Sequence, residues 1–271
     1  SDRIPGTERH LISLQYSDSD FLGQELVGQV YYRDESLRYY PFPTVNANKQ
    51  ATAFSSSQQD TDQYGMKLTL NSQLMDGWQI TWGLDAEHER FTSNQMFFDL
   101  AQASASGGLN NHKIYTTGRY PSYDITNLAA FLQSSYDIND IFTVSGGVRY
   151  QYTENWVDDF IDYTQQQKIA AGKAISADAI PGGSVDYDNF LFNAGLLMHI
   201  TERQQAWFNF SQGVALPDPG KYYGRGIYGA AVNGHLSLTK SVNVSDSKLE
   251  GVKVDSYELG WRFTGDNLRT Q

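Results

Sequence analysis

The chain has no cysteine, no long apolar run and no excess of positive charge. Without cysteine it can form neither disulfide bonds nor thiolate metal sites. No apolar run approaches the roughly 18 residues that a membrane-spanning helix needs, and the mean hydropathy is −0.49. The formal net charge of −11 argues against a nucleic-acid partner, which would require a basic stripe. Any membrane crossing would therefore have to use strands.

The chain does have alternating strand-like segments separated by five short polar turns. The turns lie near Asp18–Asp20, Asp76-Gly77, Asn139, Glu202 and Asp266, so they recur roughly every 60 residues. Each interval holds an outgoing strand, a long connection and a returning strand. In an antiparallel meander, every short turn then lies at one edge and every long connection at the other. This lopsided pattern is typical of an outer-membrane β-barrel.

The alternation is clearest in the strand expected from Phe142 to Tyr152. Successive side chains of a strand point to opposite faces, so one face here is apolar and the other polar. The apolar face holds Phe142, Val144, Val148, Tyr150 and Tyr152, and the polar face holds Thr143, Ser145, Arg149 and Gln151. The same alternation flanks Asp76-Gly77, a dipeptide that strongly favours a hairpin.

A soluble β-sandwich would alternate too, but three features favour a membrane barrel. The expected strands are longer than the ~5–6 residues of soluble sheets. The long connections run to about 25–40 residues, whereas sandwich turns are short. Aromatic side chains gather near the short turns, as in an interfacial girdle, at Trp78, Tyr136, Phe142 and Phe208. The sequence predicts an all-β fold: one domain over residues 1–271, a segment of a transmembrane antiparallel β-barrel with about ten strands, short periplasmic turns and long extracellular loops.

The four loops are expected at 34–61, 90–122, 155–186 and 215–252, the third with a short helix from Gln165 to Ala179. Tyrosine alternates there with arginine and lysine. Guanidinium groups pair bidentately with carboxylates, and tyrosine offers a rigid surface with a hydroxyl group, so the combination suits an anionic chelate. Extracellular loops and interfacial belts are rich in these residues for other reasons as well. The candidate ligand-binding residues are Arg38, Tyr39, Arg119, Tyr120, Lys221, Tyr222, Tyr223 and Arg225.

No catalytic or metal-binding motif is visible. The five histidines are scattered without metal-ligand spacing, and no nucleophile elbow frames a serine. Asp85, Glu87 and Glu89 share one strand face and are interpreted as polar residues that face water or an internal domain. The sequence therefore predicts no enzyme, although an outer-membrane hydrolase remains a third alternative.

Three segments resemble the barrel of TonB-dependent siderophore receptors, in the family's order. They are Gly146–Tyr150 (GGVRY), Phe210–Asp218 (FSQGVALPD) and Ser256–Arg262 (SYELGWR). The resemblance implies a 22-stranded barrel with an N-terminal plug domain, as in large outer-membrane transporters. The chain would supply about ten of these strands. We expect it to be a piece of a longer polypeptide without the plug, the TonB-contacting segment and the remaining strands, because open sheet edges are not tolerated in lipid.

The resemblance also implies a function in the outer membrane of a Gram-negative bacterium. Such receptors import a ferric siderophore, here expected to be ferric aerobactin, a citrate-hydroxamate complex. TonB drives the transport through the N-terminal segment that this chain lacks. Iron travels only inside the siderophore, so no cofactor or resident metal is expected. Other expected partners are the lipid bilayer and, at the loops, bacteriocins or phages. The alternatives are a passive porin and a surface adhesin.

Overall fold

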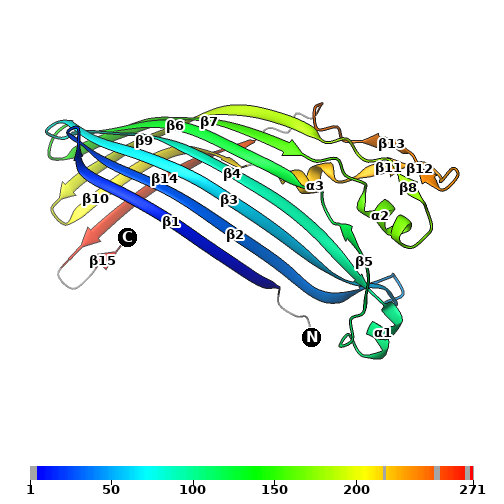
Figure 1. The fold of residues 1–271 in the computed structure, drawn as a ribbon. Helices are drawn as coiled ribbons and strands as arrows, with labels where there is room; N and C mark the ends of the chain where they lie inside the picture. The colour runs from blue at the N-terminus through cyan, green and yellow to red at the C-terminus, as the bar shows by residue number, and fades with distance from the viewer. Residues whose placement is uncertain (1–4, 216–217, 247–250, 266–268, 271) are drawn as a thin grey trace.

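The fold is a curved antiparallel sheet of eleven strands (Figure 1), seen in a computed structural model that describes residues 5–215, 218–246, 251–265 and 269–270. The strand order is β1-β2-β3-β4-β6-β7-β9-β10-β14-β15, and β5 also pairs with β4. Within the described ranges the sheet is open between β1 and β15. The strands are β1 (Gly6–Phe21), β2 (Gln24–Val45), β3 (Ala51–Met75), β4 (Trp78–Phe98), β5 (Lys113–Gly118), β6 (Tyr123–Asp137), β7 (Phe142–Val157), β9 (Gly183–Thr201), β10 (Gln204–Ala215), β14 (Val252–Thr264) and β15 (Arg269–Thr270).

The two ends of the sheet differ in their connections, as predicted. Short turns gather at one end, and small elements fill the long connections at the other (Figure 1). Two of these elements form a parallel pair and two an antiparallel pair. The small elements are α1 (Leu100–Ala105), α2 (Tyr163–Ala170), α3 (Pro219–Tyr223), β8 (Ser176–Ala177), β11 (Gly226–Tyr228), β12 (His235–Leu236) and β13 (Leu238–Ser241). No helix in the described part of the chain combines the length and apolarity needed to cross a membrane.

The strand register confirms the predicted two-faced sheet. One row of paired residues crosses five strands on the apolar face, from Leu68 through Leu84 and Ala130 to Tyr150 and Phe190. Phe190 is 52% exposed, although it is aromatic and lies in the middle of a long strand. The residues that alternate with these along each strand point to the other face and carry mainly amide, hydroxyl and charged groups. The sheet therefore presents one exposed apolar face and one polar face.

The polar face carries charged pairs near its middle and an apolar cluster near the long-connection end. Asp85 faces Arg149, with 2.5 Å between carboxylate and guanidinium, so its carboxylate is paired within the sheet itself. The cluster consists of Phe91, Tyr123, Val157, Tyr223 and Val244, and the Phe91 and Tyr123 rings stack at 4.7 Å. Because Tyr223 and Val244 belong to the fourth connection, that connection is packed against the polar face.

Three turns lie where they were expected, and one does not. The chain reverses at Asp76-Gly77, at 138–141 and at 202–203. The first turn, expected near Asp18–Asp20, is at Leu22-Gly23, where Gly23 has φ +78° and supplies the left-handed conformation that the turn needs. The turn expected near Asp266 lies outside the described residues.

The fourth expected loop (215–252) is confirmed and the third (155–186) differs by only a few residues at each end, whereas the first loop and the start of the second were wrong, because the strands there continue well beyond the expected boundaries. β2 and β3 stay paired to Val45 and Ala51, so only 46–50 connects them instead of 34–61. β4 likewise extends to Phe98. The buried run Ser55–Ser57 lies within β3, although its small polar residues resemble a loop in sequence. Cross-strand pairing with both neighbours, which sequence composition does not record, keeps this region in the sheet.

The expected helix of the third connection exists but lies earlier and is shorter. It spans Tyr163–Ala170 instead of Gln165–Ala179. Asp162 starts it, because its side chain accepts a hydrogen bond of 2.8 Å from the Thr164 N–H. Gly172, with φ +69°, follows its end. Asp99 and Asp218 cap α1 and α3 in the same way.

Candidate functional site

A cavity of about 660 Å³ lies where the second, third and fourth connections meet, and is named here the basic cavity. Its size falls within the ~300–1,000 Å³ of ordinary ligand pockets. Arg119 and Tyr120 come from the second connection, α2 and its cap from the third, and α3 with the following residues from the fourth. The lining residues are Arg119, Tyr120, Asp162, Tyr163, Thr164, Gln165, Gly220, Lys221, Gly224, Arg225 and Gly226.

Arg119 is held from several sides. Its backbone N–H donates to the Ser93 carbonyl oxygen at 3.4 Å, and the next N–H, of Tyr120, donates to Ser93 Oγ at 3.0 Å. The Nη1 atom of Arg119 donates to Gln95 Oε1 at 2.8 Å. The guanidinium carbon lies 5.3 Å from the centre of the Tyr120 ring, within the range of a cation–π contact. The guanidinium is therefore fixed at the cavity wall before any ligand arrives.

Two glycines let α3 approach the other wall closely. A Cβ atom at Gly224 would lie 3.0 Å from Pro121 Cδ, and one at Gly220 would lie 3.3 Å from Tyr120 Cβ. Tyr223, between them, is 1% exposed and packs in the apolar cluster described above. Tyr223 thus anchors α3, and the glycines set the distance at which Lys221 and Arg225 line the cavity.

The charged groups of the cavity differ in their partners. Lys221 Nζ lies 3.0 Å from Asp218 Oδ2, and this hydrogen bond raises the pKa of Lys221. Arg225 is exposed and forms no ion pair within the part of the chain that the structure describes. The Asp162 carboxylate is hydrogen-bonded to the backbone: Oδ1 accepts from the Thr164 N–H and Oδ2 accepts from the Gly226 N–H at 3.3 Å. Arg225 therefore adds a positive charge without an ion-pair partner, whereas the Asp162 carboxylate already accepts two backbone hydrogen bonds.

A phenol also lines the cavity. Burial raises the pKa of Tyr163 to about 12, so its hydroxyl stays neutral and can donate a hydrogen bond at physiological pH. Tyr163 also lies 6.2 Å, between ring centres, from Phe97, which stacks on Tyr115. Aromatic contacts thus join α2 to β4 and β5 beneath the cavity.

The structure brings four of the eight predicted residues together: Arg119, Tyr120, Lys221 and Arg225. Arg38 and Tyr39 are successive residues of β2, so their side chains leave opposite faces of the sheet. Tyr222 and Tyr223 are both residues of α3, but Tyr222 is 46% exposed, whereas Tyr223 is buried. Ligand contact by any of the eight stays a prediction.

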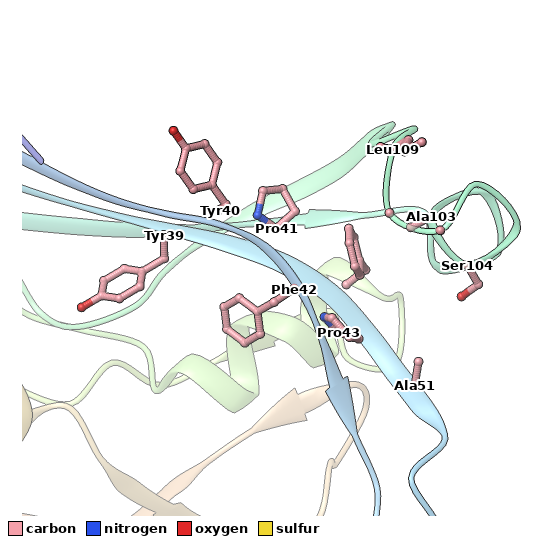
Figure 2. A pocket seen from close by; sticks show the side chains of 12 residues that line it. Tyr39, Tyr40, Pro41, Phe42, Pro43, Ala51, Ala103, Ser104 and Leu109 are labelled. Atoms are coloured by element: carbon pink, nitrogen blue, oxygen red, sulfur yellow. The ribbon is translucent and has the colours of Figure 1, made fainter. Parts of the chain in front are cut away.

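A second cavity of about 750 Å³, named here the aromatic cavity, lies at the tip of β2 and β3 next to α1 (Figure 2). Tyr39 and Phe42 project to one side of β2 and Tyr40 to the other (Figure 2). None of the described residues that line it is charged. The lining residues are Tyr39, Tyr40, Pro41, Phe42, Pro43, Ala51, Phe54, Ala103, Ser104, Gly107, Gly108 and Leu109.

Sequence reasoning predicted a helix in the third connection but named none of its residues as part of the site, and it missed a side-chain relay that joins the third and fourth connections. The Asp162–Thr164 capping pattern was the available signal for α2. The relay runs from Ser176 Oγ to His235 Nδ1 at 2.8 Å and from His235 Nε2 to Asp178 Oδ1 at 3.0 Å. The relay could not be found from sequence, because its serine and histidine lie 59 residues apart. Within the described residues, no group of histidines and carboxylates could hold a metal ion.

The chain resembles known receptors over its whole length. It is 92% identical over 271 residues to the ferric aerobactin receptor of Klebsiella pneumoniae and 86% identical to that of Escherichia coli. Both matches cover 100% of this chain and 37% of the relative, so the chain spans little more than a third of these proteins. The rhizobactin receptor of Rhizobium meliloti is 45% identical over 263 residues, covering 97% of this chain and 35% of that protein.

Solved structures and a family model agree with this resemblance. The copper transporter OprC matches with a TM-score of 0.67 at 15% identity, covering 97% of this chain and 37% of that one. The ferric yersiniabactin uptake receptor FyuA of Yersinia pestis matches with a TM-score of 0.60 at 14% identity, covering 96% and 33%. At such identities these two matches show the fold alone. The family model described as TonB dependent receptor-like, beta-barrel, matches residues 2–271. The chain therefore belongs to the TonB-dependent receptor β-barrel family.

Proposed function

We propose that the chain is the barrel segment of an outer-membrane receptor that takes up ferric aerobactin with energy delivered through TonB. The observation that carries the proposal is the basic cavity, in which Arg119, Lys221 and Arg225 surround a space of ligand size. The 92% and 86% identity to ferric aerobactin receptors supports the choice of siderophore. TonB would contact the N-terminal region of the full-length receptor.

The chemistry of the cavity suits this ligand. Aerobactin carries free carboxylates, so its iron complex is anionic. Arginine pairs bidentately with a carboxylate, and lysine adds a point charge. Tyr120 and Tyr163 add aromatic surface with hydroxyl groups. Bacteriocins and phages remain candidate partners of the same exposed connections.

The exposed apolar face of the sheet supports a location in the outer membrane. Phe190, Phe192 and Leu132 are each about half exposed, and Val148 of β7 pairs with both Leu132 of β6 and Phe192 of β9. In water such a continuous apolar surface would favour aggregation, whereas in an outer-membrane barrel it is the surface that contacts lipid. The lipid bilayer is therefore the proposed partner of this face.

The remaining alternatives have less support. The names of the family and of the relatives indicate a receptor, which favours neither a passive porin nor an adhesin. The Ser176–His235–Asp178 relay has the residue types of a hydrolase triad, but the ring nitrogens are exchanged: Nδ1 faces the serine and Nε2 the aspartate. The Ser176 N–H donates to the Gly234 carbonyl oxygen at 3.4 Å, which leaves it unsuited to an oxyanion site. The relay is better explained as a clamp between two connections.

The test is uptake of radioactive iron by iron-starved cells whose single siderophore receptor is the full-length protein. Ferric aerobactin is compared with an unrelated ferric hydroxamate, with and without functional TonB. We expect uptake of ferric aerobactin alone, and only with TonB. Uptake of neither complex would remove the substrate assignment, and TonB-independent passage of small solutes would favour the porin.

A further inference from the structure

Gln95 lies behind Arg119, outside the lining of the basic cavity. It is a β4 residue and is 4% exposed. Its Oε1 accepts the 2.8 Å hydrogen bond from Arg119 Nη1, and its Nε2 donates to Ser55 Oγ at 2.8 Å. Ser55, on the neighbouring strand β3, has no exposed surface. A buried chain of hydrogen bonds thus runs from the sheet to the guanidinium.

The amide of Gln95 can satisfy this chain in one orientation only. A side-chain amide has one accepting oxygen and one donating NH₂ group, whereas a guanidinium group only donates. Rotating the amide by 180° would set its NH₂ group against Arg119 Nη1 and leave two buried donors facing each other. The Ser55 hydroxyl can accept or donate, so the donor-only guanidinium sets the orientation of the amide, and Ser55 accepts from the NH₂ group that this orientation turns toward it.

The neutrality of this partner matters as much as its position. Gln95 orients Arg119 without cancelling its charge, as a carboxylate would. Arg119 Nε is buried and makes no hydrogen bond with the described residues, and Nη2 is not engaged by Gln95. The guanidinium therefore keeps its charge at the cavity wall, and Nη2 is the donor that remains for a ligand, because the buried Nε is out of reach.

We propose that Gln95 is a positioning residue that presents the Arg119 guanidinium to a carboxylate group of the ligand. This role rests on the proposed function, because it assumes an anionic ligand in the basic cavity. Gln95 itself does not touch the ligand. Its effect on binding must therefore pass through Arg119.

The first test is a double-mutant cycle in the purified full-length receptor, with ferric aerobactin as the probe and its Kd as the readout. We expect Gln95→Met, which preserves length, to weaken binding about 10-fold, which is the scale of one charge-assisted hydrogen bond. In an Arg119→Leu background, Gln95→Met should weaken binding no further. Equal and additive losses in both backgrounds would overturn the proposal, because a purely structural role does not require Arg119. Gln63→Met, at a buried glutamine of the neighbouring strand β3, is the matched control and should leave Kd unchanged.

The second test needs no ligand. Phenylglyoxal modifies guanidinium groups, and peptide mass spectrometry follows its reaction at Arg119. We expect Gln95→Met to speed this modification several-fold, and Gln95→Glu to keep it slow, because the carboxylate still holds Arg119. Gln95→Glu should nevertheless bind ferric aerobactin as weakly as Gln95→Met, because it neutralises the charge.

The two tests separate two failures. If the wild-type receptor does not bind ferric aerobactin while Gln95→Met still accelerates the modification, the proposed function fails and the positioning of Arg119 stands. If the modification rate is the same in wild type and in Gln95→Met, the positioning role is overturned whatever the binding result. Heat-modifiable migration in gels verifies that each variant is a folded barrel.

Discussion

The basic and aromatic cavities are similar in size and opposite in chemistry. Both lie at the long-connection end, with volumes of about 660 and 750 Å³. The basic cavity forms where three connections fold onto one another, and it holds Arg119, Lys221 and Arg225. The aromatic cavity is built on the long hairpin of β2 and β3, and the described residues that line it are all uncharged. The two cavities therefore differ in charge and not in volume, and the unpaired positive charge is the reason for proposing the basic cavity as the ligand site.

Among the variants that compare the two cavities, Arg119→Leu should weaken binding of ferric aerobactin the most. Loss of charge-assisted hydrogen bonds worth about 1.5–3 kcal/mol would weaken binding of ferric aerobactin about 10- to 100-fold. Phe42→Leu, in the aromatic cavity, is the matched control and should change Kd less than about twofold. Titration of the full-length receptor measures both. Similar losses in the two variants would abolish the distinction between the cavities.

Gly224→Val should have the second-largest effect on binding, because it forces α3 away from the opposite wall of the basic cavity. Its Cβ would meet Pro121 Cδ at 3.0 Å, and overpacking of this kind typically costs about 1–3 kcal/mol. Hydrogen exchange of residues 218–226 should become faster, and affinity should fall with it. Gly213→Ala meets no atom within 4 Å and serves as the control. Unchanged exchange in Gly224→Val would show that α3 is not held against the second connection.

The double variant Lys221→Ala, Arg225→Ala should have a smaller, salt-dependent effect. Both side chains are exposed, and Lys221 is already paired with Asp218. We expect binding to weaken several-fold at low ionic strength and to approach wild type near 1 M salt, where the Debye length is only about 3 Å. Kd measured across a salt series tests this. A loss that is independent of salt would indicate direct contacts instead of long-range attraction.

Asp178→Asn should have the smallest effect on binding, because the relay lies outside the cavity lining. Two hydrogen bonds lower the pKa of the Asp178 carboxyl group. The larger effect comes from the Leu238 backbone N–H and the smaller from the His235 side chain. Its stabilising contribution is therefore present above the ordinary value of 3.8 and is lost as pH falls through the lowered value. In Asp178→Asn the Leu238 amide should exchange faster than in wild type at neutral pH, and the difference should shrink below pH 3.8. An equal exchange rate at neutral pH would remove the clamp role.

The sheet could be predicted from sequence, because a period of two is a local signal that each strand repeats. The same signal failed at the strand ends, where polar residues such as Ser55–Ser57 resemble a loop but remain paired. The choice of Arg119, Lys221 and Arg225 rested on composition, and their convergence depended on contacts between distant connections. Gln95 had no sequence signal, because an amide within a strand is indistinguishable from any other polar position until its neighbours are known.

The three aspartates that begin the short helices show one use of acidic residues in the long connections of this chain. The chain carries a formal charge of −11. Asp99, Asp162 and Asp218 nevertheless direct their carboxylates at backbone N–H groups, and Asp218 also at Lys221. Carboxylates elsewhere on the sheet contribute little to the potential at the cavity beyond about 8 Å in physiological salt. The potential in the basic cavity therefore depends on the charges that line it, three cationic side chains and Asp162, and not on the isoelectric point of the whole chain.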